Sequence, residues 1–309
     1  MMMNKIIISI VALTLVLLAL SCDDKYSSKD PNVETMNSGN LSVSIDASIA
    51  NVLDTALKLY GLVYPNVKLD VQKVEARKAM SLLLSGNSRA VVIARDYLKD
   101  EDSLMKVYKV EKHKKLEVAI DALVFFTNSD FPIDTLNDEQ IRNILSQKDI
   151  KFSNYYKNLG FEPEFVTNTV NSSEWANLYS HVTKGNKIQK NITQLNGIDS
   201  IKNYVSKNKN AIGISYLSQL AKDPNFKILR VSFVNEKGKY EPPQIVHQAF
   251  VVQERYPYIF SYWAYLLEDR MNLPYWFASF LGKEAKIQQY FKDIGIVPAF
   301  AKIVIIKED

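Results

Sequence analysis

The sequence predicts an α/β fold built on mostly parallel sheets covered by helices. From about residue 40 onward, segments with the two-residue alternation of strands take turns with segments of helical spacing. The run Val91–Ile93 is short and wholly apolar, as is typical of strands buried on both faces of a parallel sheet. Hydrophobic residues make up 47% of the 309 residues, an ordinary share for a globular protein. The length suffices for two domains.

The first predicted unit runs strand, helix, strand, helix, strand. Apolar residues alternate in its first two strands and recur three and four positions apart in its helices. The predicted elements are a strand over 41–45, a helix over 49–57, a strand over 67–71, a helix over 75–84 and a strand over 91–93.

A long apolar strand, Val118–Phe126, opens a second unit and carries a single acid, Asp121. Asn137 is placed to cap the next helix, with Gln140 in the capping-box position. The remaining prediction comprises helices over 174–181 and 198–206, strands over 211–216, 228–234 and 249–252, an aromatic helix over 258–267 and a helical region over 274–291. Aromatic side chains of the tail are expected in the core rather than as a stacking platform: Tyr256, Tyr258, Phe260, Tyr262, Trp263 and Tyr265.

Residues 1–21 have the layout of a secretory signal peptide, because Lys5 precedes an apolar run over 6–20. The run is too short for a confident membrane span. It ends at Cys22, and small residues before a lone cysteine are typical of a bacterial lipobox, although Ala19 stands where a larger aliphatic residue is usual. We therefore expect lipidation at Cys22 and a polar tether over 22–39. The alternative is an ordinary cysteine just past the signal peptide.

Composition and motifs exclude several functions. Cys22 is the only cysteine, so no intrachain disulfide or cysteine metal cluster is expected. Without residues 1–21 the chain has 37 basic and 34 acidic residues, which gives no argument for nucleic acid. The three histidines lack metal-ligand spacing, and no nucleophile, Walker or Rossmann motif is present. We expect neither an enzyme nor a cofactor.

Four stretches, in this order, resemble the phosphate-binding (PstS-like) proteins of ABC importers. They are residues 87–98 (NSRAVVIARDYL), residues 120–128 (IDALVFFTN) with Leu136 and Asp138–Ile141 following, residues 209–216 (KNAIGISY), and residues 282–298, which end Gly295–Pro298. The resemblance implies a two-lobed, type II periplasmic-binding-protein-like fold. One lobe would hold residues 40–120 and 245–309, and the other residues 121–244. Ligand would bind in the cleft between them, with hinge closure around it.

Three junctions before helices could present donors to an oxyanion. The first comprises Asp46, Ala47, Ser48 and Ile49, where the Ser48 hydroxyl and the N–H groups of Ser48 and Ile49 could bind the anion. The alternative is that Asp46 or Ser48 simply caps the following helix.

Arg95 and Asp96 form the second junction, after a buried strand. An arginine fork suits a tetrahedral oxyanion. The resemblance implies that Asp96 accepts the proton of hydrogen phosphate, since an ionised carboxylate offers only acceptors. The alternative is a local surface ion pair.

Asn171, Ser172 and Ser173 form the third junction and align with the family's Ser-Gly-Thr segment. Its Gly and Thr are replaced here, and the nearby family Arg is absent, with neutral Asn168 and Thr169. A plain serine cap is the alternative. Asp121, near the expected hinge, must be paired or neutralised if it is buried; we expect it to bind hinge backbone rather than ligand.

These inferences predict an exported, membrane-anchored lipoprotein, a monomer, that captures inorganic phosphate and delivers it to ABC permease subunits. Two alternatives stay open. One is a binder of another oxyanion or small organic anion with the same fold. The other is a surface sensor or adhesion protein without a transport role.

Overall fold

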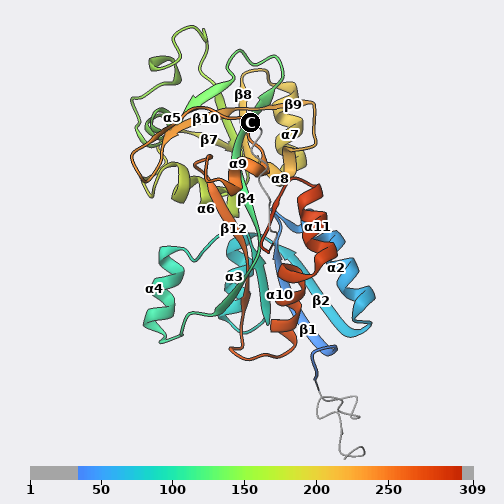
Figure 1. Cartoon of the computed structure of the whole chain (residues 1–309). Coiled ribbons are helices and arrows are strands. Elements are labelled where there is room, and N and C mark those ends of the chain that lie inside the picture. Colours follow the sequence, from blue (N-terminus) through green and yellow to red (C-terminus); the bar gives the residue numbers. More distant parts are fainter. Residues whose placement is uncertain (1–33, 301–309) are drawn as a thin grey trace, which may run out of the picture.

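The computed structural model describes residues 34–300, which form two lobes joined by long strands (Figure 1). The α/β class and the two-lobed arrangement expected from the sequence are confirmed. The predicted signal peptide, Cys22 and the tether up to residue 33 lie outside the described residues.

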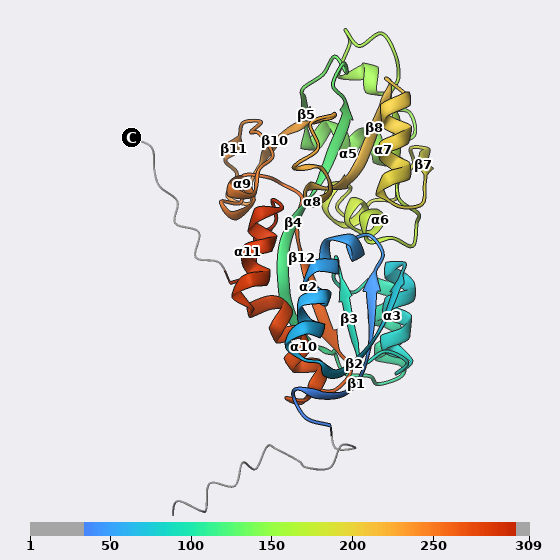
Figure 2. The same ribbon diagram turned by 90° about the vertical axis from the view of Figure 1, so that its right-hand side faces the viewer.

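The first lobe is built on the parallel strands β1 (Ser38–Asp46), β2 (Asn66–Val74) and β3 (Ala90–Ile93), with β1 in the centre. Helices α2 (Ala50–Val63) and α10 (Leu273–Lys283) lie on one side of this sheet and α3 (Ala76–Leu84) on the other (Figure 2). Val92 packs in the larger core, whereas Val91 and Ile93 pack with α3. The all-apolar strand β3 is thus buried on both faces, as its sequence predicts. Helices α4 (Lys99–Val107) and α11 (Ala285–Asp293) complete the lobe.

The strand β4 (Lys114–Asn128) runs through both lobes. It pairs antiparallel with β12 (Ile259–Leu266) from Lys114 to Ala122, and then with β8 (Ala211–Tyr216) from Leu123 to Phe126. One ten-stranded sheet therefore passes through both lobes, in the order β2-β1-β3-β12-β4-β8-β6-β7, with β9 and β13 also paired to β4. The two lobes share this pair of long strands as their connection.

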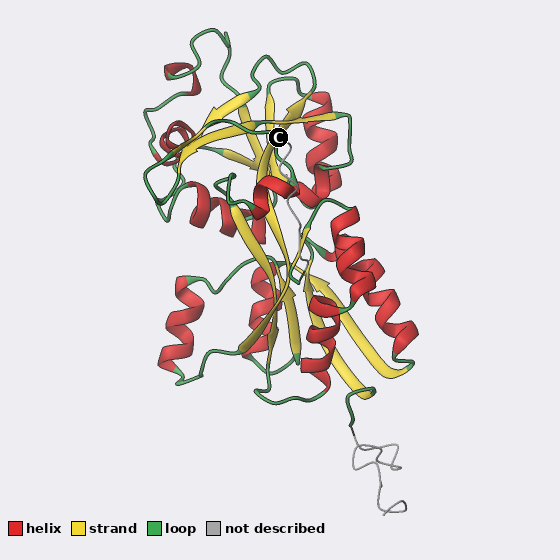
Figure 3. Ribbon diagram, viewed as in Figure 1, coloured by secondary structure: helices red, strands yellow, loops and turns green. Residues whose placement is uncertain are grey.

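The second lobe extends the sheet with β6 (Glu164–Thr167) and β7 (Ile192–Gln194), both parallel to their neighbours, and with β9 (Phe226–Ile228). A small separate sheet joins β5 (Thr135–Asn137), β10 (Arg230–Val234) and β11 (Tyr240–Glu241). Its helical elements, shown in Figure 3, are α5 (Asp138–Ser146), η1 (Phe152–Asn154), α6 (Ser173–Asn177), the π turn η2 (Leu178–Val182), α7 (Ile198–Lys207), α8 (Leu217–Leu220) and α9 (Gln248–Val252). β13 (Val297–Pro298) follows α11 and pairs with β4 at Ile120 and Ala119.

Two predictions for the tail are wrong, and a third, which is otherwise confirmed, needs a division. Residues 259–266 form strand β12 rather than an aromatic helix, because Phe260, Tyr262 and Ala264 are buried in alternation and the strand is paired on both sides. Residues 248–252 form a helix rather than a strand, and the His247 side chain caps it by accepting a hydrogen bond from the Ala249 N–H (3.2 Å). The helical region over 274–291 is divided at Glu284 into α10 and α11.

The return of the chain to the first lobe lies where β12 begins. Tyr256 donates a hydrogen bond to the Leu123 carbonyl (2.9 Å), and Tyr258 donates one to Asp138 (3.0 Å). Residues 256–258 therefore lie against the second lobe, whereas the sequence placed the return at residue 245. The core position predicted for the tail aromatics is confirmed for Tyr256, Tyr258, Phe260, Tyr262 and Tyr265, which are all buried.

Between residues 34 and 300, no helix combines the length and hydropathy that a membrane span requires.

Gly282 in α10 marks a close approach of the helix to β4. A Cβ atom at this position would lie 2.5 Å from the Glu117 carbonyl oxygen, which is too close for any real contact.

We expect Gly282→Ala to lower the free energy of unfolding by about 1–3 kcal/mol, because backbone must shift to relieve the overlap. Gly61 in α2 is the matched control, since nothing lies within 4 Å of its added Cβ. Gly61→Ala should raise stability by about 0.4–1 kcal/mol. Urea denaturation of both variants checks this, and equal effects would contradict the packing described.

Candidate ligand site between the lobes

Asp46 ends strand β1 at the surface that the first lobe turns toward the second, and its side chain is fully buried. One carboxylate oxygen accepts from the Ser48 N–H (3.0 Å) and the other from the Ala94 N–H (3.3 Å). Burial raises the pKa of Asp46, while hydrogen bonding to Ser173 of the second lobe is the strongest opposing effect. Asp46 is thus an acceptor-rich group shared between two lobes.

A second acid, Glu174, meets Asp46 from the other lobe. It stands in the first turn of α6 and is 1% exposed. Its Oε2 accepts a short hydrogen bond from the Ser48 hydroxyl, and the Asn168 amide lies 3.4 Å from both carboxylate oxygens. Burial raises the pKa of Glu174 to about 7, and the charge of Asp46 acts in the same direction. Two neighbouring buried carboxylates resist double ionisation, so we infer that the pair keeps a proton near neutral pH.

Further polar contacts surround this acid pair. Tyr216 donates to the Ser173 hydroxyl (2.7 Å), and the Asn177 amide donates to both Tyr216 (3.1 Å) and the Ala94 carbonyl of the first lobe (2.7 Å). Gln219 of α8 donates to the Ser48 carbonyl (3.1 Å). The two lobes are therefore in direct contact in this structure, through a buried network of hydroxyl, amide and carboxyl groups.

The first predicted junction supplies Asp46 and Ser48 to this network. The Ala47 N–H donates to the Val74 carbonyl (2.8 Å), and the Ile49 N–H donates to the Asp46 carbonyl (3.0 Å). These two backbone donors are engaged within the first lobe. Ser48 reaches the second lobe through both its hydroxyl and its carbonyl.

The third predicted junction lies on the facing side. Ser172 caps α6, since its hydroxyl accepts from the Trp175 N–H (3.2 Å) and donates to the Thr169 carbonyl (2.7 Å). Ser173 belongs to the network around Asp46. Asn171 lies at the exposed rim and donates to Glu75 of the first lobe (3.3 Å). The structure brings Asp46, Ser48 and Ser173 together, with a cap and a rim contact beside them.

Arg95 and Asp96 follow Ala94 of this network, but their side chains bond to other groups. The Arg95 guanidinium makes a bidentate pair with Glu101 (2.6 and 2.8 Å) and also donates to the Asp96 and Ala76 carbonyls. Arg95 and Glu101 are buried, so removing either one would leave the other charge unpaired, which is strongly destabilising. An Arg95 variant would therefore report on folding, and the expected contact of Arg95 with an anion stays a prediction.

The Asp96 carboxylate is largely exposed and pairs with Lys115 and the Tyr265 hydroxyl. Burial lowers the pKa of His181 in the second lobe, and the charge of Asp96 opposes this shift. The role of Asp96 as a proton acceptor from the ligand also stays a prediction.

Asp121 lies on β4 beside the change of pairing from β12 to β8. Its carboxylate accepts from the N–H groups of Ala122 (2.7 Å) and Ser218 (3.3 Å) and from the Tyr262 hydroxyl (2.5 Å). Burial raises its pKa. These partners favour the structural interpretation, in which Asp121 holds the crossing strands rather than the ligand.

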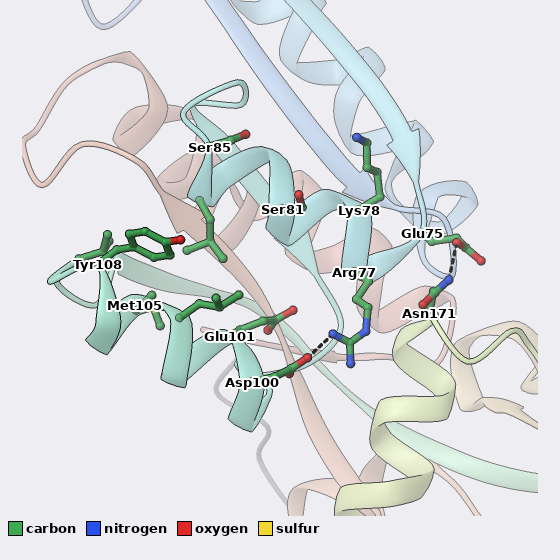
Figure 4. A pocket seen from close by; sticks show the side chains of 13 residues that line it. Glu75, Arg77, Lys78, Ser81, Ser85, Asp100, Glu101, Met105, Tyr108 and Asn171 are labelled. Atoms are coloured by element: carbon green, nitrogen blue, oxygen red, sulfur yellow. Dashed lines mark hydrogen bonds and ion pairs between the residues drawn. The ribbon is translucent and has the colours of Figure 1, made fainter.

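A hollow of about 570 Å³ lies on the first lobe between α3 and α4. Figure 4 shows Arg77 paired with Asp100 across its mouth and Asn171 bonded to Glu75 at its edge. Aliphatic side chains such as Leu84 and Met105 line much of it. The Asn171–Glu75 contact makes this edge a second point where the lobes touch.

Sequence analysis missed Glu174, Asn177 and Tyr216. Glu174 directly follows the predicted segment 171–173, and that adjacency was the one signal available. Tyr216 closes a strand that was predicted, but nothing in its pattern indicates a site. Among the described residues, no three or more His, Cys, Asp and Glu side chains gather as a metal site would need.

A family model for the PBP superfamily domain matches residues 30–284. A phosphate-binding protein, PstS, of Pseudomonas aeruginosa is 30% identical over 112 residues, which cover 35% of this chain and 34% of that protein. The aligned stretch thus spans about a third of this curated relative.

Solved structures of similar fold cover more of the chain. A phosphate-bound protein of Clostridium perfringens, described as a phosphate ABC transporter substrate-binding protein, has a TM-score of 0.69 at 19% identity, over 84% of this chain and 99% of that one. An ABC-type phosphate transport receptor from Vibrio cholerae has a TM-score of 0.63 at 18% identity, over 84% and 100%. The chain therefore belongs to the PBP superfamily, with the two-lobed fold of the PstS-like binding proteins.

Proposed function

We propose that this protein is an extracytoplasmic binding protein that captures inorganic phosphate between its lobes and delivers it to the permease subunits of an ABC importer. The observation that carries the proposal is the convergence of polar groups from both lobes on one buried point. Ser48 comes from the first lobe, and Ser173 and Tyr216 come from the second. A phosphate ABC transporter substrate-binding protein and an ABC-type phosphate transport receptor share the fold.

The chemistry of the junction suits an oxyanion that still bears a proton. Hydroxyl groups rotate to donate to ligand oxygens or to accept from ligand hydroxyls. A buried carboxylate such as Asp46 offers acceptors when ionised, so it favours a ligand with an O–H group. Hydrogen phosphate has that group near neutral pH, whereas sulfate does not. The protein is proposed to bind its ligand without transforming it.

One observation favours a second candidate function. The contacts described around Asp46 and Glu174 involve serine, asparagine, tyrosine and glutamine but no lysine or arginine. A site without a cation attracts a doubly charged anion less strongly, so it favours that anion less over singly charged or neutral ligands. Another oxyanion or a small organic anion rich in hydroxyl groups would therefore be the alternative ligand.

We further propose that the protein is exported and held at a membrane by a lipid on Cys22. The support is the apolar segment over 6–20 that ends at the only cysteine of the chain. Cys22→Ala should move the protein from the membrane fraction to the soluble fraction, and Ser21→Ala is the control beside it. Fractionation after a high-salt wash measures this. Continued pelleting of the Cys22 variant would contradict the anchor.

Calorimetric titration of the protein lacking residues 1–22 tests ligand identity. We expect binding of phosphate in preference to sulfate. Ser48→Ala should weaken phosphate binding by about tenfold or more, because a hydrogen bond to a charged group contributes roughly 1.5–3 kcal/mol. Ser103, an exposed serine of α4, supplies the control Ser103→Ala, which should leave the affinity unchanged. If the wild type binds neither anion, the phosphate assignment fails.

A further inference from the structure

We propose that the Glu174 carboxylate is an internal occupant of the ligand position, so that an external oxyanion binds only by displacing it. The inference rests on the proposed function, because it names what already fills the site of that function. It concerns the same junction and adds a competitor supplied by the chain itself.

The contacts of Glu174 are those expected for a bound anion. Its carboxylate accepts from the Ser48 hydroxyl of the first lobe and lies within 3.4 Å of the Asn168 amide of the second. Ser48 is the donor that the sequence assigned to the ligand. A carboxylate is itself a small oxyanion that offers only acceptors, so it satisfies these donors as a phosphate oxygen would. With 1% exposure, Glu174 leaves little room for solvent at this point.

Charge also prevents the ligand and the Glu174 carboxylate from occupying this point together. The charge of Asp46, from the first lobe, contributes to raising the pKa of Glu174. Burial raises the pKa of Tyr216, and the charge of Glu174 raises it further. An anion placed beside both acids would add charge to a buried space that already holds the negative charge of the acid pair, which like-charge repulsion opposes. Entry of a ligand thus requires the Glu174 side chain to leave.

The same contact bridges the lobes. Glu174 belongs to α6 in the second lobe, and its hydrogen-bond donor Ser48 precedes α2 in the first. The carboxylate therefore does without a ligand what a ligand does in a hinged binding protein, which is to connect the two faces. We expect the ligand-free wild type to be compact. We also expect this internal competitor to lower the affinity of the wild type for phosphate.

Glu174→Thr and Glu174→Gln test the proposal. Threonine removes the carboxylate and vacates most of its space, whereas glutamine removes the charge and keeps the volume. Glu139→Gln is the matched control, since Glu139 is an exposed acid in the first turn of α5 in the same lobe. Phosphate affinity is measured by calorimetry, and the radius of gyration is measured by solution scattering with and without phosphate.

We expect Glu174→Thr to bind phosphate at least tenfold more tightly than the wild type. Without phosphate, its radius of gyration should exceed that of the wild type, and phosphate should restore the compact value. Glu174→Gln should gain less, and Glu139→Gln should match the wild type. Unchanged affinity together with unchanged scattering in Glu174→Thr would overturn the proposal, and equal gains in both Glu174 variants would contradict occupancy of the site.

Failure of the proposed function gives a different pattern. If no form of the protein binds phosphate, the ligand assignment falls, and the ligand-free scattering decides the present inference. A larger radius in Glu174→Thr but not in Glu139→Gln would then support the internal bridge, and equal radii would overturn it. Should Glu174→Thr fail to fold, Glu174→Gln decides by its phosphate affinity: a gain supports the proposal and no gain overturns it.

Discussion

The hydrogen bond from Ser48 to Glu174 links the two lobes at a buried point. It joins the turn between β1 and α2 of one lobe to the first turn of α6 in the other. Asp46 lies beside it, held by backbone N–H groups of its own lobe and by Ser173 of the other. A buried acid needs partners or a proton; each acid has partners in its own lobe, and Glu174 gains a further donor, Ser48, from the other lobe. Their burial therefore couples the chemistry of the site to the relative position of the lobes.

The connection between the lobes also contains a buried acid, and that acid too has hydrogen-bond partners. Asp121 is buried where β4 exchanges β12 for β8, and it accepts hydrogen bonds from the N–H groups of Ala122 in β4 and Ser218 in α8 and from the Tyr262 hydroxyl of β12. These contacts involve β4, β12 and the start of α8, so they fix the crossing without reaching the ligand position. One carboxylate thus stabilises the connection between the lobes, while Asp46 and Glu174 lie in the contact between their facing surfaces.

The sequence predicted much of the fold because its strongest signals are local. The wholly apolar β3 and the alternation of β1 and β2 follow directly from burial on one or two faces. The cap of α5 by Asn137 is likewise a short-range pattern, and the structure shows its side chain accepting from Glu139 and Gln140. Strand β12 was missed because its tyrosines and phenylalanine fit several periodicities. Only pairing with both β3 and β4 decides that this segment is extended.

The candidate site was predictable in part, for the same reason. Asp46, Ser48 and Ser173 stand at recognisable junctions before helices, and the structure brings them together. Glu174 could not be assigned from the sequence, because its role comes from Ser48 and Asp46, more than 120 residues away along the chain. Arg95 looked like an anion-binding group, yet its guanidinium is bonded to Glu101 six residues later, in a buried pair that the spacing alone does not reveal.

A double-mutant cycle between Ser48 and Glu174 tests the central claim most directly. The free energy of unfolding would be measured in urea for the wild type, Ser48→Ala, Glu174→Gln and the double variant. If the two side chains hold the lobes together, their coupling energy should be about 1.5 kcal/mol or more, as for other hydrogen bonds to charged groups. A coupling energy near zero, with all four proteins folded, would contradict the account.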